Sequence, residues 1–334
     1  MLNNYNNQDM PMQEPQQSQA TEPPITIENL LDTLDEQKQN KIASECKSAF
    51  EDDLRSRGEW ESNIDDWIAL AKQTKQDKTY PWPGASNVKY PLVATAAMQF
   101  AARSYPSLVP SNGKVVNSVV IGKDPAGQKY EKANRVSTYM SYQIMHEMLG
   151  WEEDMDKMLI MLPVVGTIFK KTYWDSIKKL PASEVISPKN LVVNYWTKSL
   201  ETSERISQII EMSPRVLQER KMAGVFLDID LGSAPAPLTT SGNTPSNDET
   251  TPYTIIEQHT YLDLDDDDYP EPYVVTFHME SGKVLRIAPR FSEKTMYFKD
   301  GKLVKIEPIQ YYTKFGFVPN PDGGFYDLGF GTLL

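Results

Sequence analysis

The stretch from Tyr80 to Pro110 constrains the fold more than any other, because its two halves differ sharply in character. The first half, YPWPGASN, holds two prolines and a glycine. Each proline fixes φ near −65° and favours extended geometry at the preceding residue, so this half predicts a stiff turn. In the second half only Thr95 and Gln99 are polar between Leu92 and Ala102. Such a helix is apolar nearly all round, which predicts burial.

We expect this helix to run from Pro91 to Tyr105, with Pro106 just past its end. It is too short to cross a bilayer, which takes about 20 apolar residues. Its alanines leave a smooth surface that neighbours can approach closely. The sequence therefore predicts either a core helix or a helix buried between subunits. The alanines are Ala94, Ala96, Ala97, Ala101 and Ala102.

Composition limits the classes of function. The chain has 334 residues, 40% hydrophobic and 24% charged, which is ordinary for a soluble protein of roughly two domains. Its net charge of −12 argues against a general nucleic-acid binder held by phosphate contacts. The single cysteine, Cys46, excludes an internal disulfide and fits a reducing cytosol. The N-terminus lacks the features of a signal peptide, and no run is long enough to span a bilayer.

The pattern predicts an α+β fold in which helices precede strands. Residues 1–24 are rich in Asn, Gln and Pro, which predicts a disordered tail. Residues 25–162 are expected to be mainly helical, with helices at 27–57, 60–71, 126–149 and 151–162 and one strand at 114–122. The apolar face of the helix at 126–149 is expected to hold Ala133, Val136, Met140, Ile144 and Met148.

Residues 163–334 predict an antiparallel β region. Strands are expected at 164–174, 191–195, 203–212 and 253–262, and hairpins at 273–288 and 295–306. Ser213 and Pro214 predict the start of a short helix that ends before Gly224. Residues 228–252 predict a long mobile loop.

The candidate chemical motifs are incomplete. His146-Glu147 opens a zinc-protease helix pattern, but Gly150 stands where the second histidine ligand belongs. His259 and His278 fall on expected strands and are interpreted as structural. The run from Asp263 to Asp268 fails the EF-hand pattern, which leaves a loose surface cation site or, more simply, a solvated acidic turn.

Other motifs favour structural roles as well. Trp60 and Trp67 fit either a platform for stacking bases or a core stripe, and their helical spacing favours the core. Gly329-Phe330-Gly331 lacks the third glycine of a dinucleotide fingerprint, and Cys46 is expected to be a small core residue. No catalytic, cofactor or metal site is therefore predicted. Scattered basic residues are expected on solvated faces, namely Lys170, Lys171, Lys178, Lys179, Arg215, Arg220 and Lys221.

Three segments carry a resemblance to a known family. They are WPGASNVKYPLVATAAMQFAARSYPSLVP (82–110), NYWTKSLE (194–201) and PDGGFYDLGFG (321–331). Together they resemble the N-terminal part of portal proteins, the head-to-tail connectors of short-tailed bacteriophages, over about residues 25–334. The resemblance implies a wing-like region that the family continues into a stem, clip and crown, and the apolar end at 325–334 is expected to be a chain cut in mid-fold.

The resemblance further implies a homo-oligomeric ring, typically dodecameric, at one capsid vertex, through which DNA enters and leaves. It implies docking of large terminase, tail adaptors and capsid or scaffold proteins, with no catalysis, no cofactor and no membrane. A closed ring requires two different complementary faces on each subunit, so we expect exposed apolar patches near 92–102 and 325–334. The alternatives are a hydrolase with a site between the helical and β regions, and another capsid or tail component.

Overall fold

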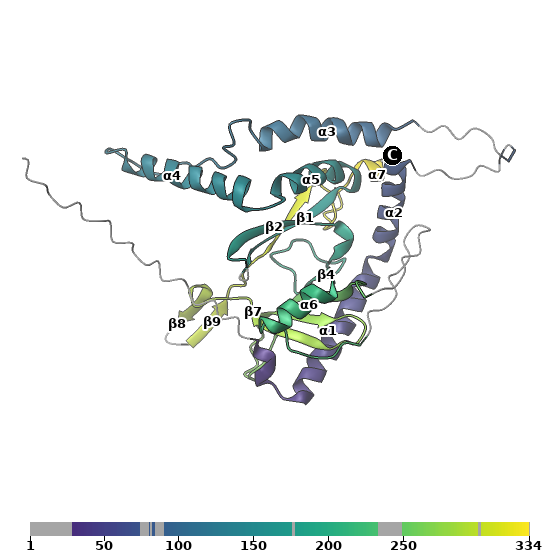
Figure 1. The fold of residues 1–334 in the computed structure, drawn as a ribbon, viewed down its shortest axis with the longest axis vertical. Helices are drawn as coiled ribbons and strands as arrows, with labels where there is room; N and C mark the ends of the chain where they lie inside the picture. Colours follow the sequence, from purple (N-terminus) through teal and green to yellow (C-terminus); the bar gives the residue numbers. More distant parts are fainter. Residues whose placement is uncertain are drawn as a thin grey trace, which may run out of the picture.

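The computed structural model describes residues 29–73, 80, 82–83, 90–175, 178–232, 249–299 and 302–333. The expected tail at 1–24 and most of the expected stiff turn at 80–87 lie outside these residues. The α+β expectation is confirmed: long helices come first and antiparallel strands follow (Figure 1). The described helices are η1 (Leu30–Thr33), α1 (Glu36–Ser56), α2 (Gly58–Lys72), α3 (Leu92–Leu108), α4 (Gln128–Tyr142), a π-helix η2 (Gln143–Glu147), α5 (Trp151–Val165), η3 (Pro188–Asn190), α6 (Pro214–Met222), η4 (Glu293–Thr295) and α7 (Phe330–Leu333).

The strands form three antiparallel sheets with orders β10-β1-β2, β3-β4-β5-β6-β7 and β8-β9. The expected hairpins at 273–288 and 295–306 are confirmed as β6-β7 and β8-β9, whereas β2 and β10 were not foreseen. The strands are β1 (Thr167–Asp175), β2 (Leu180–Ile186), β3 (Leu191–Val192), β4 (Ile206–Met212), β5 (Tyr253–Leu262), β6 (Glu271–His278), β7 (Val284–Pro289), β8 (Met296–Lys299), β9 (Lys302–Ile306) and β10 (Tyr312–Gly316).

The five-stranded sheet is covered on both faces. Side chains alternate along a strand, so the neighbours Ile255 and Ile256 of β5 point to opposite sides. Ile256 packs with Phe50 of α1, whereas Ile255 packs with Leu217 of α6. Ser213 caps the start of α6: its hydroxyl accepts a hydrogen bond from the backbone N–H of Val216, which confirms the expected N-cap.

The helical and β regions share one core. It includes Trp60 and Ile64 of α2, Val93 of α3 and Val165 of α5, packed with Phe169 of β1. The boundary between helices and strands falls at Gly166, three residues later than the expected boundary before residue 163, because α5 continues through its proline. The division into regions 25–162 and 163–334 as separate domains stays a prediction.

Two prolines that were expected to end helices lie inside them. Helix α3 passes Pro106 to Leu108, and α5 passes Pro163 to Val165. A proline removes one backbone donor, but the later N–H groups can still bond. Val109 N–H donates to the carbonyl oxygen of Tyr105 at 2.8 Å, so the last turn of α3 stays closed.

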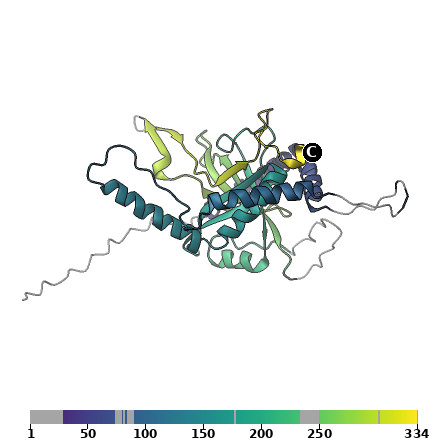
Figure 2. The ribbon, with the colours of Figure 1, turned by 90° about the horizontal axis from the view of Figure 1, so that it is seen from above.

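The expected strand at 114–122 was wrong. Among the described residues this segment has no strand partner. Two serines of α4 take the backbone groups of Val116 instead: its N–H donates to the Ser141 hydroxyl at 3.1 Å, and its carbonyl accepts the Ser137 hydroxyl. Ser118 of the segment donates in turn to the Ala133 carbonyl of α4 at 2.7 Å. We call the segment and α4 together the arm (residues 111–142); it projects from the body of the molecule (Figures 1 and 2).

The expected face of α4 was also wrong. Ser137 and Ser141 are its buried residues, while Val136 and Met140 are 46% and 43% exposed. The inner face of α4 is therefore polar and forms hydrogen bonds with the extended segment, while Val136 and Met140 face solvent. Residues 233–248 of the expected mobile loop lie outside the described part; the flanking 228–232 and 249–252 contain no helix or strand, and Thr251 is buried.

A glycine pair joins the end of α5 to the C-terminal segment. Gly166 has φ +82°, and a Cβ there would overlap the carbonyl oxygen of Asp327. Gly329 lies against the backbone of Gly166 and Val164 in the same way. The segment before α7 can therefore approach α5 only because both positions lack a side chain.

We expect Gly166→Ala to lower the free energy of unfolding by about 3 kcal/mol, from the positive φ together with overpacking. Gly224→Ala is the matched control, because Gly224 has φ +70° but nothing within 4 Å of an added Cβ. It should cost only about 1 kcal/mol. Urea denaturation measures both, and equal losses would show that the backbone contact is unimportant.

Candidate functional site

A groove of about 290 Å³ lies where α2 meets the turn at Tyr195 and the segment 320–332. We call it the α2 groove. Its volume is at the lower limit of small-molecule sites, about 300–1,000 Å³, which suits one or two inserted side chains better than a cofactor. Its lining is aromatic and acidic, and includes Glu59, Trp60, Asn63, Trp67, Tyr195 and Tyr326.

Two buried charges at the end of α1 hold the floor of the groove. Asp53, fully buried, accepts hydrogen bonds from the Arg205 guanidinium at 2.8 and 3.0 Å and from the Asn194 side-chain amide at 2.9 Å. Arg57, also fully buried, donates to the carbonyl oxygens of Leu191 at 2.7 Å and Lys189 at 2.5 Å. The chain entering the Tyr195 turn is thereby fixed to α1.

The aromatic wall confirms the core interpretation of the tryptophan stripe. Trp60 is 9% exposed and stacks on Tyr326 with ring centroids 3.6 Å apart. Trp67 packs against the same core, and a Cβ on Gly331 would overlap its ring. The Gly329-Phe330-Gly331 run therefore makes room for a tryptophan and for backbone, which explains its glycines without a nucleotide.

A second polar cluster lies buried between the sheets. Glu257 of β5 accepts hydrogen bonds from Lys171 of β1 at 2.7 Å and from Tyr312 of β10 at 3.2 Å, and His259 Nε2 lies 3.1 Å away. Burial alone would raise the pKa of Glu257, but the ammonium of Lys171 and the imidazole of His259 hold it below its ordinary value. Burial lowers the pKa of His259. The cluster joins the sheets electrostatically and lies outside the α2 groove.

The three histidines do not converge. His259 pairs with Val274 across β5-β6, whereas His278 pairs with Ile255, four residues away along β5. At about 3.3 Å per residue this separation is about 13 Å. His278 Nδ1 contacts the Ser281 hydroxyl at 2.8 Å, and His146 lies exposed in η2. None of the three lines the α2 groove.

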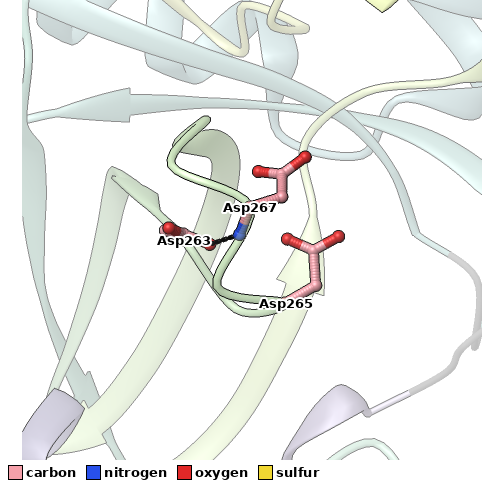
Figure 3. Close-up of side chains that lie close together, drawn as sticks. All are labelled: Asp263, Asp265 and Asp267. Atoms are coloured by element: carbon pink, nitrogen blue, oxygen red, sulfur yellow. Dashed lines mark hydrogen bonds between the residues drawn. The ribbon is translucent and has the colours of Figure 1, made fainter.

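The acidic turn between β5 and β6 brings three carboxylates together. Oxygens of Asp263, Asp265 and Asp267 lie within 4.8 Å of one another, and all three side chains are exposed (Figure 3). The Asp263 carboxylate accepts the backbone N–H of Asp267 at 3.2 Å, and Asp266 pairs with Lys38 at 2.6 Å. The turn is thus closed by its own hydrogen bonds and an ion pair, as a solvated acidic turn requires.

For two of the basic residues the expected exposure to solvent was wrong. Lys170 and Lys171 are 5% and 9% exposed, because β1 lies between β10 and β2. Lys171 pairs with Glu257, and Lys170 lies over the Trp151 ring with its pKa lowered by burial. The partner that accounts for Lys171 is 86 residues away in sequence, so no local pattern could reveal it.

The remaining basic candidates divide between solvent and local partners. Lys178 and Lys179 are exposed. On α6, Arg215 pairs with Glu219, the Arg220 guanidinium lies over the Phe226 ring, and the largely buried Lys221 pairs with Asp228 at 3.1 Å.

Cys46 is 3% exposed on α1 and packs against the five-stranded sheet, as expected of a core residue. Burial raises the pKa of its thiol to about 12.

The exposed apolar side chains of α3 and the arm were only partly foreseen. On α3 the residues Val93, Ala97 and Ala101 are buried at every fourth position, whereas Leu92 and Met98 are 53% and 56% exposed. The arm also exposes large apolar side chains, namely Val119, Ile121, Tyr130, Val136, Tyr139, Met140 and Tyr142. Leu333 is exposed at the other expected patch, while Phe325 and Tyr326 are buried. Helix α3 is thus half buried in the single chain.

The chain matches no protein-family model, and comparison with curated proteins finds no significantly similar sequence. None of the described helices combines the length and apolarity needed to cross a lipid bilayer.

We expect Asp53→Asn to lower the free energy of unfolding by about 2 kcal/mol, because the fully buried Asp53 carboxylate accepts charge-assisted hydrogen bonds from the partly exposed Arg205 guanidinium and from Asn194 that an amide cannot all replace. Asp52→Asn is the matched control. Asp52 is exposed and pairs with Arg55 on the same helix, which contributes at most about 0.5 kcal/mol. Urea denaturation distinguishes the two, and a loss below about 1 kcal/mol for Asp53→Asn would contradict the assignment.

Acid should destabilise the protein in two steps. The folded-state pKa of His259 is lowered, so the unfolded chain binds the extra proton first and stability falls as the pH drops below about 6.5. Glu257 contributes a further loss of unfolding free energy below about pH 4.3, because its pKa is lower in the folded protein than in the unfolded chain. We expect His259→Gln to reduce the loss between pH 7 and 5, leaving the part due to His278, whose pKa burial also lowers. An unchanged loss between pH 7 and 5 in His259→Gln would contradict this assignment.

Proposed function

We propose that this chain is a structural subunit of a bacteriophage portal ring at one capsid vertex, the conduit for DNA packaging and ejection. The observation that carries the proposal is the apolar surface that α3 and the arm leave exposed. Large exposed apolar surfaces mark sites of protein–protein interaction. A subunit of a closed ring needs interfaces of this kind on two different faces.

The positions of the three portal-like segments support the same proposal. Segment 82–110 contributes Val93 and Ala97 to the shared core, 194–201 contributes Leu200, and 321–331 contributes Phe325 and Tyr326. Segments that resemble the family therefore converge on the framework of the fold. A shared framework is what a structural subunit has in common with its relatives, and we propose no covalent chemistry, cofactor or metal for it.

Charge fits a conduit better than a DNA-binding protein. With a net charge of −12, the surface repels phosphate, and weak adhesion favours a polymer that must slide. In this proposal the partners are further copies of the chain, large terminase, tail adaptors and capsid or scaffold proteins, with double-stranded DNA passing without sequence specificity. The ring would be assembled in the host cytoplasm and reside in the virion.

Electron microscopy of the purified chain tests the proposal. We expect rings with a central channel at micromolar protein concentration. A chain that stays monomeric at every concentration overturns the proposal, as does turnover of a small-molecule substrate. A closed shell or a tube without a channel-bearing ring would favour another capsid or tail component.

We expect Met98→Asp to raise the dissociation constant of the assembly at least tenfold, because about 1.4 kcal/mol or more of apolar contact is lost. Met222→Asp is the matched control, since Met222 is 80% exposed on α6, away from α3. It should leave assembly unchanged. Sedimentation velocity measures the distribution of species, and unfolding curves confirm that both variants fold as the parent does.

A further inference from the structure

The arm has no hydrophobic core of its own. Among the described residues, none between 111 and 142 belongs to a buried core cluster of the molecule. Its helix is joined to the extended segment by hydrogen bonds such as that from Ser118, and many of its large apolar side chains face solvent. Helices of this length are marginal in water without tertiary packing. The arm therefore needs a surface to pack against.

The outward face of α4 is both aromatic and basic. Lys132, Arg135, Tyr139 and Tyr142 follow one another at spacings of three and four, which places them on one side of the helix, opposite Ser137. Tyr139 and Tyr142 are 59% and 52% exposed. Neither Lys132 nor Arg135 has an ion-pair partner in the described part of the chain. The partner surface should therefore be hollow, aromatic and acidic.

The charge of the arm is opposite to that of the rest of the chain. The arm holds five basic residues against Asp124 and Glu131, a net charge of +3, while the whole chain carries −12. The remaining residues therefore carry −15. The basic residues are Lys114, Lys123, Lys129, Lys132 and Arg135. A second copy of this chain consequently offers the arm an electrostatically complementary surface.

The α2 groove has the required properties. Its hollow is lined by Trp60, Trp67 and Tyr195, and Tyr195 is 55% exposed. Along α2, Glu61 and Asp65 have partners in Arg57 and Lys189, but Glu59 and Asp66 have no ion-pair partner among the described residues. Glu59 lines the groove, and Asp66 lies one turn from Asn63, which also lines it.

The arm and the groove lie on opposite sides of the molecule. In Figure 1, α4 extends to the left while α2 and α7 are on the right, and Figure 2 shows the same separation of α4 from the C-terminal end. An arm cannot occupy the groove of its own chain in this arrangement. A contact between opposite sides of successive copies is head-to-tail, which is the type that builds rings.

We propose that the arm of one copy docks in the α2 groove of the next copy. Tyr139 and Tyr142 enter the aromatic hollow, and Lys132 and Arg135 pair with Glu59 and Asp66. The inference rests on the proposed ring and names the surfaces that join its subunits. The same face of α4 presents basic and aromatic side chains that a nucleic acid could also bind. The acidic remainder of the chain would repel the phosphates of a nucleic acid, however, so a second copy is the better partner.

Disulfide trapping tests the geometry directly. Cys46 is buried, so an introduced cysteine is the accessible thiol of its chain. Mixing Tyr139→Cys with Asn63→Cys should give a mixed disulfide dimer on mild oxidation, and the double variant should give a ladder or a closed species. Neither single variant should link to itself. Linking of Tyr139→Cys to itself, or no link in the mixture, overturns the head-to-tail contact.

Charge reversal tests the pairing. One double variant reverses the arm (Lys132→Glu with Arg135→Glu), and the other reverses the groove (Glu59→Lys with Asp66→Lys). We expect each to raise the dissociation constant of the assembly at least tenfold, as measured by sedimentation velocity. An equimolar mixture of the two double variants should assemble as the parent does, because the reversed charges are again complementary. Lys294→Glu with Lys299→Glu, the same change of charge on and beside exposed β8, is the control and should have no effect.

The outcomes separate the two proposals. A parent chain that stays monomeric overturns the ring and the arm contact together. Assembly that is indifferent to arm and groove reversals overturns the arm contact alone. Unchanged assembly with weaker, salt-dependent binding of a double-stranded DNA fragment by the Lys132→Glu, Arg135→Glu variant would assign the arm to nucleic acid instead.

Discussion

The fold depends on two charges buried at the end of α1. Asp53 binds Arg205 and Asn194, and Arg57 binds the carbonyl oxygens of the 188–191 segment. A charge removed from water is destabilising unless hydrogen bonds and a countercharge replace the solvent. These bonds connect the first long helix to the start of the five-stranded sheet and to the turn at Tyr195. The α2 groove exists because this junction fixes the relative positions of its walls.

The contrast between buried polar and exposed apolar groups gives the molecule its functional character. Charges such as Glu257 and Lys171 are enclosed between sheets, while leucine, methionine and tyrosine side chains of α3 and the arm face solvent. The hollow beside α2 offers tryptophan and tyrosine faces together with the Glu59 carboxylate. This distribution supports a role in assembly, which is the role proposed for the chain.

Local signals predicted much of the fold. The Ser213-Pro214 start of α6, the tryptophan stripe of α2 and the hairpins β6-β7 and β8-β9 follow from caps, periodicity and turn chemistry within a few residues. Predictions failed where the hydrogen-bond partners of a segment lie elsewhere in the chain. Residues 114–122 have the composition of a strand, but Ser137 and Ser141 of α4 take the backbone groups of Val116, and nothing within the segment indicates this.

The same reasoning explains what sequence patterns missed in the candidate site. Tyr195 and Tyr326 meet in the groove although 131 positions separate them, and only tertiary structure brings them together. The basic character of the arm, in contrast, is readable as a local excess of Lys and Arg in an acidic chain. Apolar periodicity alone assigned the face of α4 wrongly, because it gave no weight to the serines that pack inward.

The placement of arm and groove on opposite sides has a consequence for growth of the assembly. Any two copies joined as proposed leave one unused arm and one unused groove, so addition ends only when the last arm meets the first groove. The angle at the root of the arm then sets how many copies complete the circle. The π-helix η2, whose Met148 N–H reaches back to the Gln143 carbonyl at 2.9 Å, occupies that root. A small change of winding there would convert a circle of one size into another, or into an open spiral.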